Sequence, residues 1–182
     1  GDPDWRKAIL AQILGNGDEL RTGPFGGRGL AFNERTQMRI HANTRIRIAA
    51  PLSNASEPRR FDLRFGKIWS RASSPDKELL IRTPSANAAI RGTDWYLETF
   101  ESGGTRLVVF DGSVEFFNDS GRVVVPPGRS AGADVGTAPV LEAIVEQKDK
   151  PRWVIQPTID IDALLEEKLP DDRKGALRSI VT

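Results

Sequence analysis

The sequence predicts an all-β domain, and three observations predict it. Between Glu19 and Val125 apolar and polar residues alternate every two positions in many short runs, which on strands places the apolar side chains on one face. Turn-forming glycine, asparagine and aspartate residues separate these runs. Beyond Pro157 the period changes, and apolar residues fall at helical spacing. We therefore expect one β domain followed by a short helical extension.

The predicted strands follow the alternation in chain order. In the run 37–41, Met38 and Ile40 face the opposite way from Arg39, and the run 45–48 repeats the arrangement. The same reasoning predicts further strands at 29–32, 61–65, 67–70, 79–82, 88–91, 95–100, 106–110, 113–117 and 123–125.

Glycine-bearing turns connect the central runs. Asp111 and Gly112 lie between two apolar runs, and Asp-Gly accommodates the positive φ angles of a tight turn, so this pair predicts a hairpin. The segments 102–104 and 118–121 predict two looser turns. The run 107–110 is apolar on both faces and should lie at the centre of the core.

The C-terminal third changes character. Pro126 and Pro127 end the strand region, and the small residues of 132–139 predict an extended linker. We place the all-β domain at 5–138 and a linker or docking segment at 139–157, in which Trp153 clamps the tail onto the β domain. A helical extension at 158–182 follows from apolar spacing, with acidic residues at the predicted helix starts.

Composition excludes several classes of protein. The 182 residues carry a formal charge of +1, which argues against a dedicated nucleic-acid binder. The hydrophobic content of 38% is ordinary for a globular protein. No apolar run approaches the length of a membrane span. Cysteine is absent, so disulfides and thiolate chemistry are excluded. The chain opens Gly1-Asp2-Pro3 without methionine, and we expect that any targeting segment is missing from it.

No residue set predicts catalysis, a cofactor or a metal, so we expect a protein that is not an enzyme. The run 128–132 fits G-x-S-x-G, but a nucleophile elbow requires a strand before it and a helix after it. Here prolines precede the run and no helical pattern follows it. His41 lies alone on the polar face of a strand. Asp94 and Glu98 share a strand face about 13 Å apart, which is too far for a glycosidase pair.

Three arginines form the strongest candidate binding site. Arg39, Arg45 and Arg47 are expected on the same side of adjacent strands, where they could grip an anionic partner: an acidic peptide, a sulfated or uronic glycan, or the acidic end of this chain. The alternative is an ordinary solvated sheet face.

Four segments together resemble the FecR domain family. The run Ile90-Arg91-Gly92-Thr93-Asp94-Trp95 followed by Asp111-Gly112-Ser113-Val114 is similar to the family's V-R-G-T-x-F element and its V-x-x-G-x-V hairpin. The segments 18–23, 38–48 and 61–68 resemble its G-D-x-L-x-T-G entry, a pair of strands and an L-x-x-G-x-V hairpin. The resemblance makes Gly92, Thr93, Trp95, Asp111 and Gly112 structural positions, with Trp95 in the core.

This resemblance implies an elongated, twisted, mostly antiparallel β-roll or sandwich, whereas alternation alone leaves sandwich, barrel and roll open. It also implies a non-enzymatic bacterial envelope protein with its β domain in the periplasm. We expect a sensor or interaction module that binds a protein partner in envelope signalling or assembly. An anionic-glycan-binding domain is the alternative, and an enzyme would need ligands or carboxylates that we do not find. The run 152–157 before the predicted helices resembles the junction that precedes tetratricopeptide repeats.

Overall fold

The computed structural model describes residues 5–9, 12–26, 28–31, 37–49, 58–71, 78–154 and 177–180. Within these residues the chain forms fifteen strands and two short 3-10 helices, so the all-β prediction is confirmed. The elements are β1 (Gln12–Leu14), β2 (Glu19–Arg21), β3 (Arg28–Ala31), β4 (Gln37–Ile40), β5 (Arg45–Ile48), β6 (Arg59–Arg71), β7 (Leu79–Arg82), β8 (Asn87–Ile90), β9 (Asp94–Thr99), β10 (Thr105–Asp111), β11 (Val114–Asn118), β12 (Gly121–Val125), β13 (Arg129–Ala133), β14 (Val140–Ile144), η1 (Gln147–Asp149), η2 (Arg152–Val154) and β15 (Leu177–Ile180).

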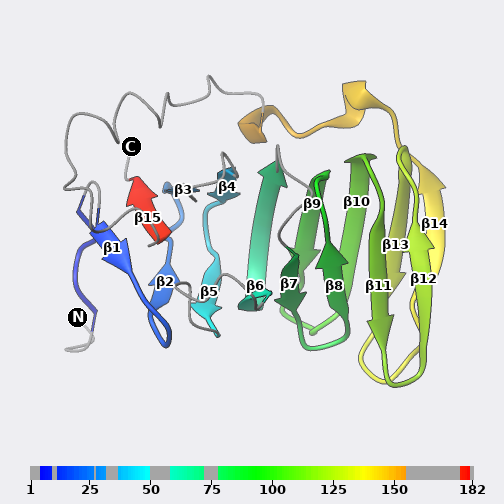
Figure 1. Ribbon diagram of the computed structural model, residues 1–182, viewed down its shortest axis with the longest axis horizontal. Coiled ribbons are helices and arrows are strands. Elements are labelled where there is room, and N and C mark those ends of the chain that lie inside the picture. The colour runs from blue at the N-terminus through cyan, green and yellow to red at the C-terminus, as the bar shows by residue number, and fades with distance from the viewer. Residues whose placement is uncertain are drawn as a thin grey trace.

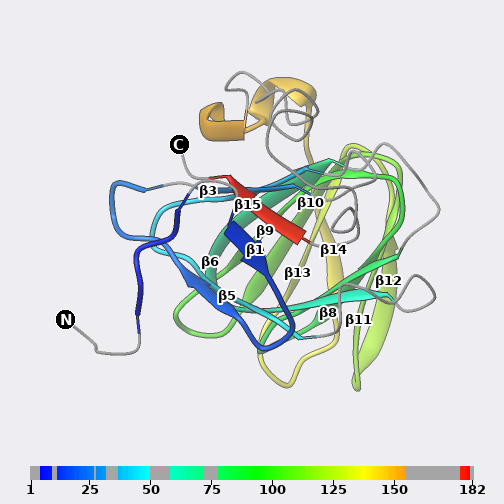
Figure 2. The same ribbon diagram turned by 60° about the vertical axis from the view of Figure 1, so that its left-hand side comes forward.

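The strands form two sheets that share β6. Sheet A has the order β1-β15-β3-β4-β6-β9-β10-β13-β14, and sheet B has the order β2-β5-β6-β7-β8-β11-β12. Every pair is antiparallel except β6 with β7. The strands stand side by side along the long axis in Figure 1, and the turned view in Figure 2 shows the two sheets enclosing the interior. The predicted elongated, mostly antiparallel roll is confirmed.

Strand β6 passes from one sheet into the other at Gly66. Its first half pairs with β5 and β7 in sheet B, and its second half pairs with β4 and β9 in sheet A. Gly66 has φ +106°, and a Cβ there would lie 2.4 Å from Thr44 Oγ1. The hairpin expected at 61–68 is therefore wrong. The glycine bends a continuous strand, because its left-handed backbone redirects the chain without reversing it.

The main core lies between the two sheets. Its largest fully buried side chains include Trp95, Phe61 and Phe116, so Trp95 occupies the core position expected for it. Strand β10 is buried on both sides, which confirms the prediction for 107–110. Leu107 and Val109 point into the main core, whereas Val108 and Phe110 join Trp69 and Tyr96 in a second cluster on the outer face of sheet A.

The turn at Asp111 and Gly112 connects the sheets and is not a hairpin. Strand β10 pairs with β9 and β13 in sheet A, whereas β11 pairs with β8 and β12 in sheet B. Gly112 has φ +76°, and a Cβ there would lie 2.5 Å from Cγ2 of the buried Thr93 and 3.2 Å from the Gly92 carbonyl oxygen. The predicted positive φ is confirmed. However, Gly112 packs tightly against Gly92 and Thr93, and the chain passes into the other sheet there. The turns at 102–104 and 118–121 do form the expected hairpins, β9–β10 and β11–β12.

The C-terminal boundaries differ from the sequence expectation. The sheet continues past residue 138 because β13 pairs with β10, and β14 adds to β13 inside the segments expected to be linker. Residues 177–180 form β15 between β1 and β3, so the predicted helix is not present at these four residues. Pairing on both edges outweighs the helical spacing there. The rest of the expected extension, 158–176 and 181–182, lies outside the described residues.

We predict that Gly66→Ala lowers the free energy of unfolding by about 3 kcal/mol, because an alanine there combines backbone strain with a clash against Thr44. Gly17→Ala is the matched control: Gly17 has φ +91° and nothing within 4 Å of its added Cβ, so only strain of about 1 kcal/mol applies. Urea denaturation of both variants measures the difference. Equal losses would show that the Thr44 contact does not constrain the crossover.

Candidate partner-binding surfaces

The three predicted arginines do not form one row. Arg39 lies on β4 in sheet A, whereas Arg45 and Arg47 lie on β5 in sheet B. Strands β4 and β5 do not pair with each other, because each pairs with a different half of β6. The prediction that the three arginines lie on the same side of adjacent strands is therefore wrong. They belong to two separate surfaces.

The first surface, here called the arginine face, is the outer side of sheet B across β2, β5, β6 and β7. Its cross-strand neighbours include Glu19 with Arg47, Arg47 with Asp62, and Asp62 with Arg82. Six arginines against two carboxylates leave a formal excess of four positive charges, whereas the whole chain carries +1. The members are Arg21, Arg45, Arg47, Arg60, Arg64, Arg82, Glu19 and Asp62.

Sequence reasoning found two of these arginines and missed the other four. Arg60 and Arg64 alternate with the buried Phe61 and Leu63, so the period-two pattern could have placed them on the outer face. Sheet order could not be read from the sequence, and only sheet order brings Arg82 beside Asp62.

Glu19 and Trp5 organise one end of the arginine face. The Arg45 guanidinium donates hydrogen bonds to the Glu19 carboxylate, one of them from Nη2 to Oε2 at 3.2 Å. This hydrogen bonding lowers the pKa of Glu19, and the nearby charges of Arg45, Arg64 and Arg47 add to the effect. The guanidinium carbons of Arg21 and Arg45 lie 5.8 and 5.9 Å from the centroid of the Trp5 ring. Such contacts hold guanidinium groups in place for a planar anion.

The second surface is the outer face of sheet A, and residues 145–154 lie across it. We call this segment the strap; it contains η1 and η2 and is drawn in gold in Figure 2. The Trp153 ring centroid lies 4.7 Å from that of His41 and 6.0 Å from that of Tyr96. Arg39 Nη1 donates a hydrogen bond to the Trp153 carbonyl oxygen at 3.3 Å. Trp153 therefore lies against the β domain, as its expected docking role requires.

Asp94 anchors the strap from within sheet A. Its side chain is 2% exposed. Oδ1 accepts a hydrogen bond from Trp69 Nε1 at 2.7 Å, and Oδ2 lies 3.0 Å from Arg71 Nη2 and 2.5 Å from Lys150 Nζ. Lys150 Nζ also lies 4.8 Å from the centroid of the Phe110 ring. Sequence reasoning missed this anchor, because no local pattern links Asp94 to a lysine 56 residues away.

Glu98, the other carboxylate on this strand face, has different partners. Tyr96 Oη donates a hydrogen bond to Glu98 Oε2 at 2.5 Å, and Lys67 Nζ lies 2.8 Å from Oε1. Burial and the Glu98 hydrogen bond raise the pKa of Tyr96. Asp94 and Glu98 thus serve two separate structural networks.

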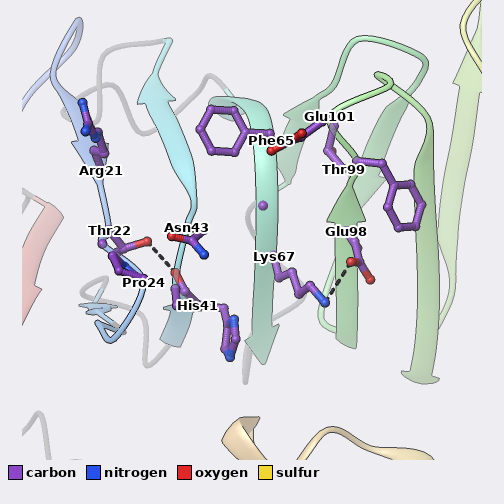
Figure 3. A pocket seen from close by; sticks show the side chains of 14 residues that line it. Arg21, Thr22, Pro24, His41, Asn43, Phe65, Lys67, Glu98, Thr99 and Glu101 are labelled. Carbon is purple, nitrogen blue, oxygen red and sulfur yellow. Dashed lines mark hydrogen bonds and ion pairs between the residues drawn. The ribbon is translucent and has the colours of Figure 1, made fainter.

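A groove of about 840 Å³ opens where the sheets diverge at Gly66. Figure 3 shows Phe65 and Lys67 of β6 between the His41–Asn43 turn and the end of β9, with the Lys67–Glu98 ion pair on one side. Thr22 Oγ1 donates a hydrogen bond to the His41 carbonyl oxygen at 2.6 Å and closes the opposite wall. His41 therefore belongs both to this groove and to the contact with Trp153.

The described part of the chain contains neither a candidate metal site nor a membrane-spanning helix. No group of three or more histidine, aspartate or glutamate side chains there could hold a metal ion. Nor does that part contain a helix long and apolar enough to cross a membrane.

We predict that His41, the chain's one histidine, titrates below the ordinary value of 6.5. Burial lowers its pKa most, the charge of Lys67 lowers it further, and Glu98 acts in the opposite direction. An NMR titration of the single imidazole measures this. Because the depressed pKa belongs to the folded state, His41 contributes stability above about pH 6.5 that is lost as the pH falls through the folded pKa.

Trp153→Ala should raise the pKa of His41 toward 6.5 by admitting water to the ring. Trp5→Ala is the control, because the Trp5 ring contacts Arg21 and Arg45 of sheet B, and it should leave the pKa of His41 unchanged. An unchanged pKa in Trp153→Ala would contradict the contact between the strap and His41.

Comparison with known proteins supports the fold and identifies the family. Two crystal structures of a protein provisionally assigned as an anti-sigma factor from Parabacteroides distasonis ATCC 8503 superpose with TM-scores of 0.65 and 0.64, at 14% and 13% identity. Each match covers 82% of this chain and 72% of the other. A search of curated proteins finds no match. The FecR protein family matches residues 18–115, from the start of β2 into β11, which is 98 of the 182 residues. The chain belongs to the FecR family.

Proposed function

We propose that this protein is a non-enzymatic interaction module of envelope signalling, located in the periplasm, that binds an acidic protein partner through the arginine face. The observation that carries the proposal is the gathering of six arginines on one outer face in a chain that is nearly neutral as a whole. Membership of the FecR family supports the regulatory role.

The arginine face suits recognition of carboxylates. Arginine presents a planar fork of donors that matches a carboxylate with two parallel hydrogen bonds. Arg21, Arg47, Arg64 and Arg82 are exposed, and their strands are fixed by pairing within sheet B. A rigid sheet limits the conformational entropy lost on binding. An unbalanced positive field also speeds the encounter with an acidic surface.

An anionic glycan is the second candidate. Sulfate and uronate groups offer the same planar or branched oxygen acceptors to guanidinium groups. The groove lining is mixed in charge, with Arg21 and Lys67 against Glu98 and Glu101, so the arginine face is the stronger candidate for an anionic sugar as well. Binding to sulfated or uronic sugars on a glycan array would favour this candidate over a protein partner.

The triple variant Arg47→Ala, Arg64→Ala, Arg82→Ala should reduce partner capture from an envelope extract by about tenfold or more, since each lost charge-assisted contact is worth about 1 kcal/mol. The control variant Arg91→Ala, Arg106→Ala, Arg122→Ala makes the same change in net charge elsewhere on the surface and should bind normally. Capture by the wild type should also weaken as salt rises. Equal capture by both triple variants would contradict the arginine face as the binding surface.

The proposed location has its own test. In spheroplasts that express the full-length protein, protease added from outside should degrade the β domain while a cytoplasmic marker stays intact. Protection of the domain until the cells are lysed would place it in the cytoplasm and contradict the proposal.

A further inference from the structure

We propose that the outer face of sheet A is a second binding site, which takes a short segment of a partner protein that carries a lysine three residues before an aromatic residue. The strap is then the intramolecular occupant of this site, with Lys150 and Trp153 in these two roles. The inference goes beyond the arginine face, because it concerns the other sheet and a ligand of opposite charge.

The cation subsite is built entirely from sheet A. Asp94 of β9 supplies a carboxylate that is 2% exposed and directed at Lys150 Nζ, 2.5 Å away. The rings of Trp69 on β6 and Phe110 on β10 flank the ammonium group of Lys150, with their centroids 5.7 and 4.8 Å from Nζ. A buried carboxylate between two aromatic faces selects an ammonium group over a neutral side chain.

The aromatic subsite lies beside the cation subsite on the same face. Tyr96 and His41 contact the Trp153 ring, and Arg39 Nη1 donates a hydrogen bond to the carbonyl oxygen of the same residue. Because Arg39 binds a backbone carbonyl oxygen, this hydrogen bond does not depend on which aromatic side chain the ligand carries at that position.

The strap is joined to the sheet in a way that permits exchange. Its first residue, Val145, donates a backbone hydrogen bond to the Gly128 carbonyl at 2.9 Å, but the strap belongs to no strand of either sheet. Within the strap, Glu146 and Asp149 bond to each other: the Glu146 amide donates to Asp149 Oδ2 and the Asp149 amide donates to the Glu146 carbonyl. Beyond Val145, whose side chain packs against the outer cluster of sheet A, Lys150 and Trp153 carry the attachment. Segments without a backbone ladder open at low cost.

Asp94 would keep partners if the strap left. Trp69 Nε1 donates to Oδ1 at 2.7 Å and Arg71 Nη2 lies 3.0 Å from Oδ2, and both belong to the sheet. Removing Lys150 therefore does not leave the Asp94 carboxylate buried without a partner. A buried charge left unpaired is the usual large penalty for opening a buried ion pair. The site is ready for a second cation-bearing segment when the strap is displaced.

The test uses the full chain with the strap opened by Lys150→Met and Trp153→Ala. A fluorescently labelled peptide with the sequence of residues 145–154, VEQKDKPRWV, should bind this variant in an anisotropy titration. It should bind the wild type at least about tenfold more weakly, because the strap competes in cis. Adding Asp94→Asn to the opened variant, or replacing the lysine at position 150 in the peptide with methionine, should each weaken binding about tenfold or more.

Several results would overturn the proposal. One is no binding to an opened variant whose circular dichroism and thermal unfolding match the wild type, and another is binding that Asp94→Asn does not change. A wild-type dimer that dissociates on Asp94→Asn would assign the site to the strap of a second copy instead. If the opened variant does not fold, hydrogen exchange of the strap amides in Lys150→Met decides: exchange faster by about tenfold supports the proposal, and unchanged exchange overturns it.

Failure here is distinguishable from failure of the proposed function. The triple variant of Arg47, Arg64 and Arg82 changes only sheet B, so its strap amides should exchange as in the wild type. Loss of partner capture in that variant with normal strap exchange concerns the arginine face alone.

Discussion

The structure depends on one strand that serves two sheets. Strand β6 gives its first half to sheet B and its second half to sheet A, and Gly66 makes the transition possible where a side chain would collide with Thr44. Thr44 is itself fixed there, since its Oγ1 accepts a hydrogen bond from the Lys67 amide at 3.0 Å. Sharing a strand couples the sheets covalently and sets the space for the core between them. It also separates β4 from β5, and with them Arg39 from Arg45 and Arg47.

The two outer faces therefore present different binding groups. Sheet B carries the arginine face, which suits carboxylates, whereas sheet A presents the buried carboxylate of Asp94 between aromatic rings, which suits a cation. Rigid β scaffolds with binding groups on their outer faces are suited to recognition, because little ordering is needed when a partner binds. In our two proposals, the FecR-family domain binds one partner through the arginine face while a segment of a second partner competes with the strap on sheet A.

The sequence predicted the elements better than their arrangement. Alternation located most central strands because their inward residues are strongly apolar, as at Met38 and Ile40. It missed β13, whose small residues Ser130 and Ala131 are fully buried but carry little apolar signal. At Asp111 and Gly112 the sequence correctly predicted a turn with positive φ but wrongly predicted that the two flanking strands pair with each other. Strand order depends on long-range packing, which the local sequence does not contain. For the same reason no sequence signal places Arg82 beside Asp62 or Lys150 beside Asp94, whereas alternation could have placed Arg60 and Arg64 on an outer face.

We infer that both halves of β6 belong to one cooperative unit, and native-state hydrogen exchange measures whether they do. The amides of 61–63 in sheet B and 68–70 in sheet A should exchange only through global unfolding, with the same free energy in both halves. Halves whose exchange free energies differ by more than about 2 kcal/mol would contradict it. That outcome would mean that the sheets open independently and that β6 does not hold the two faces in a fixed relation.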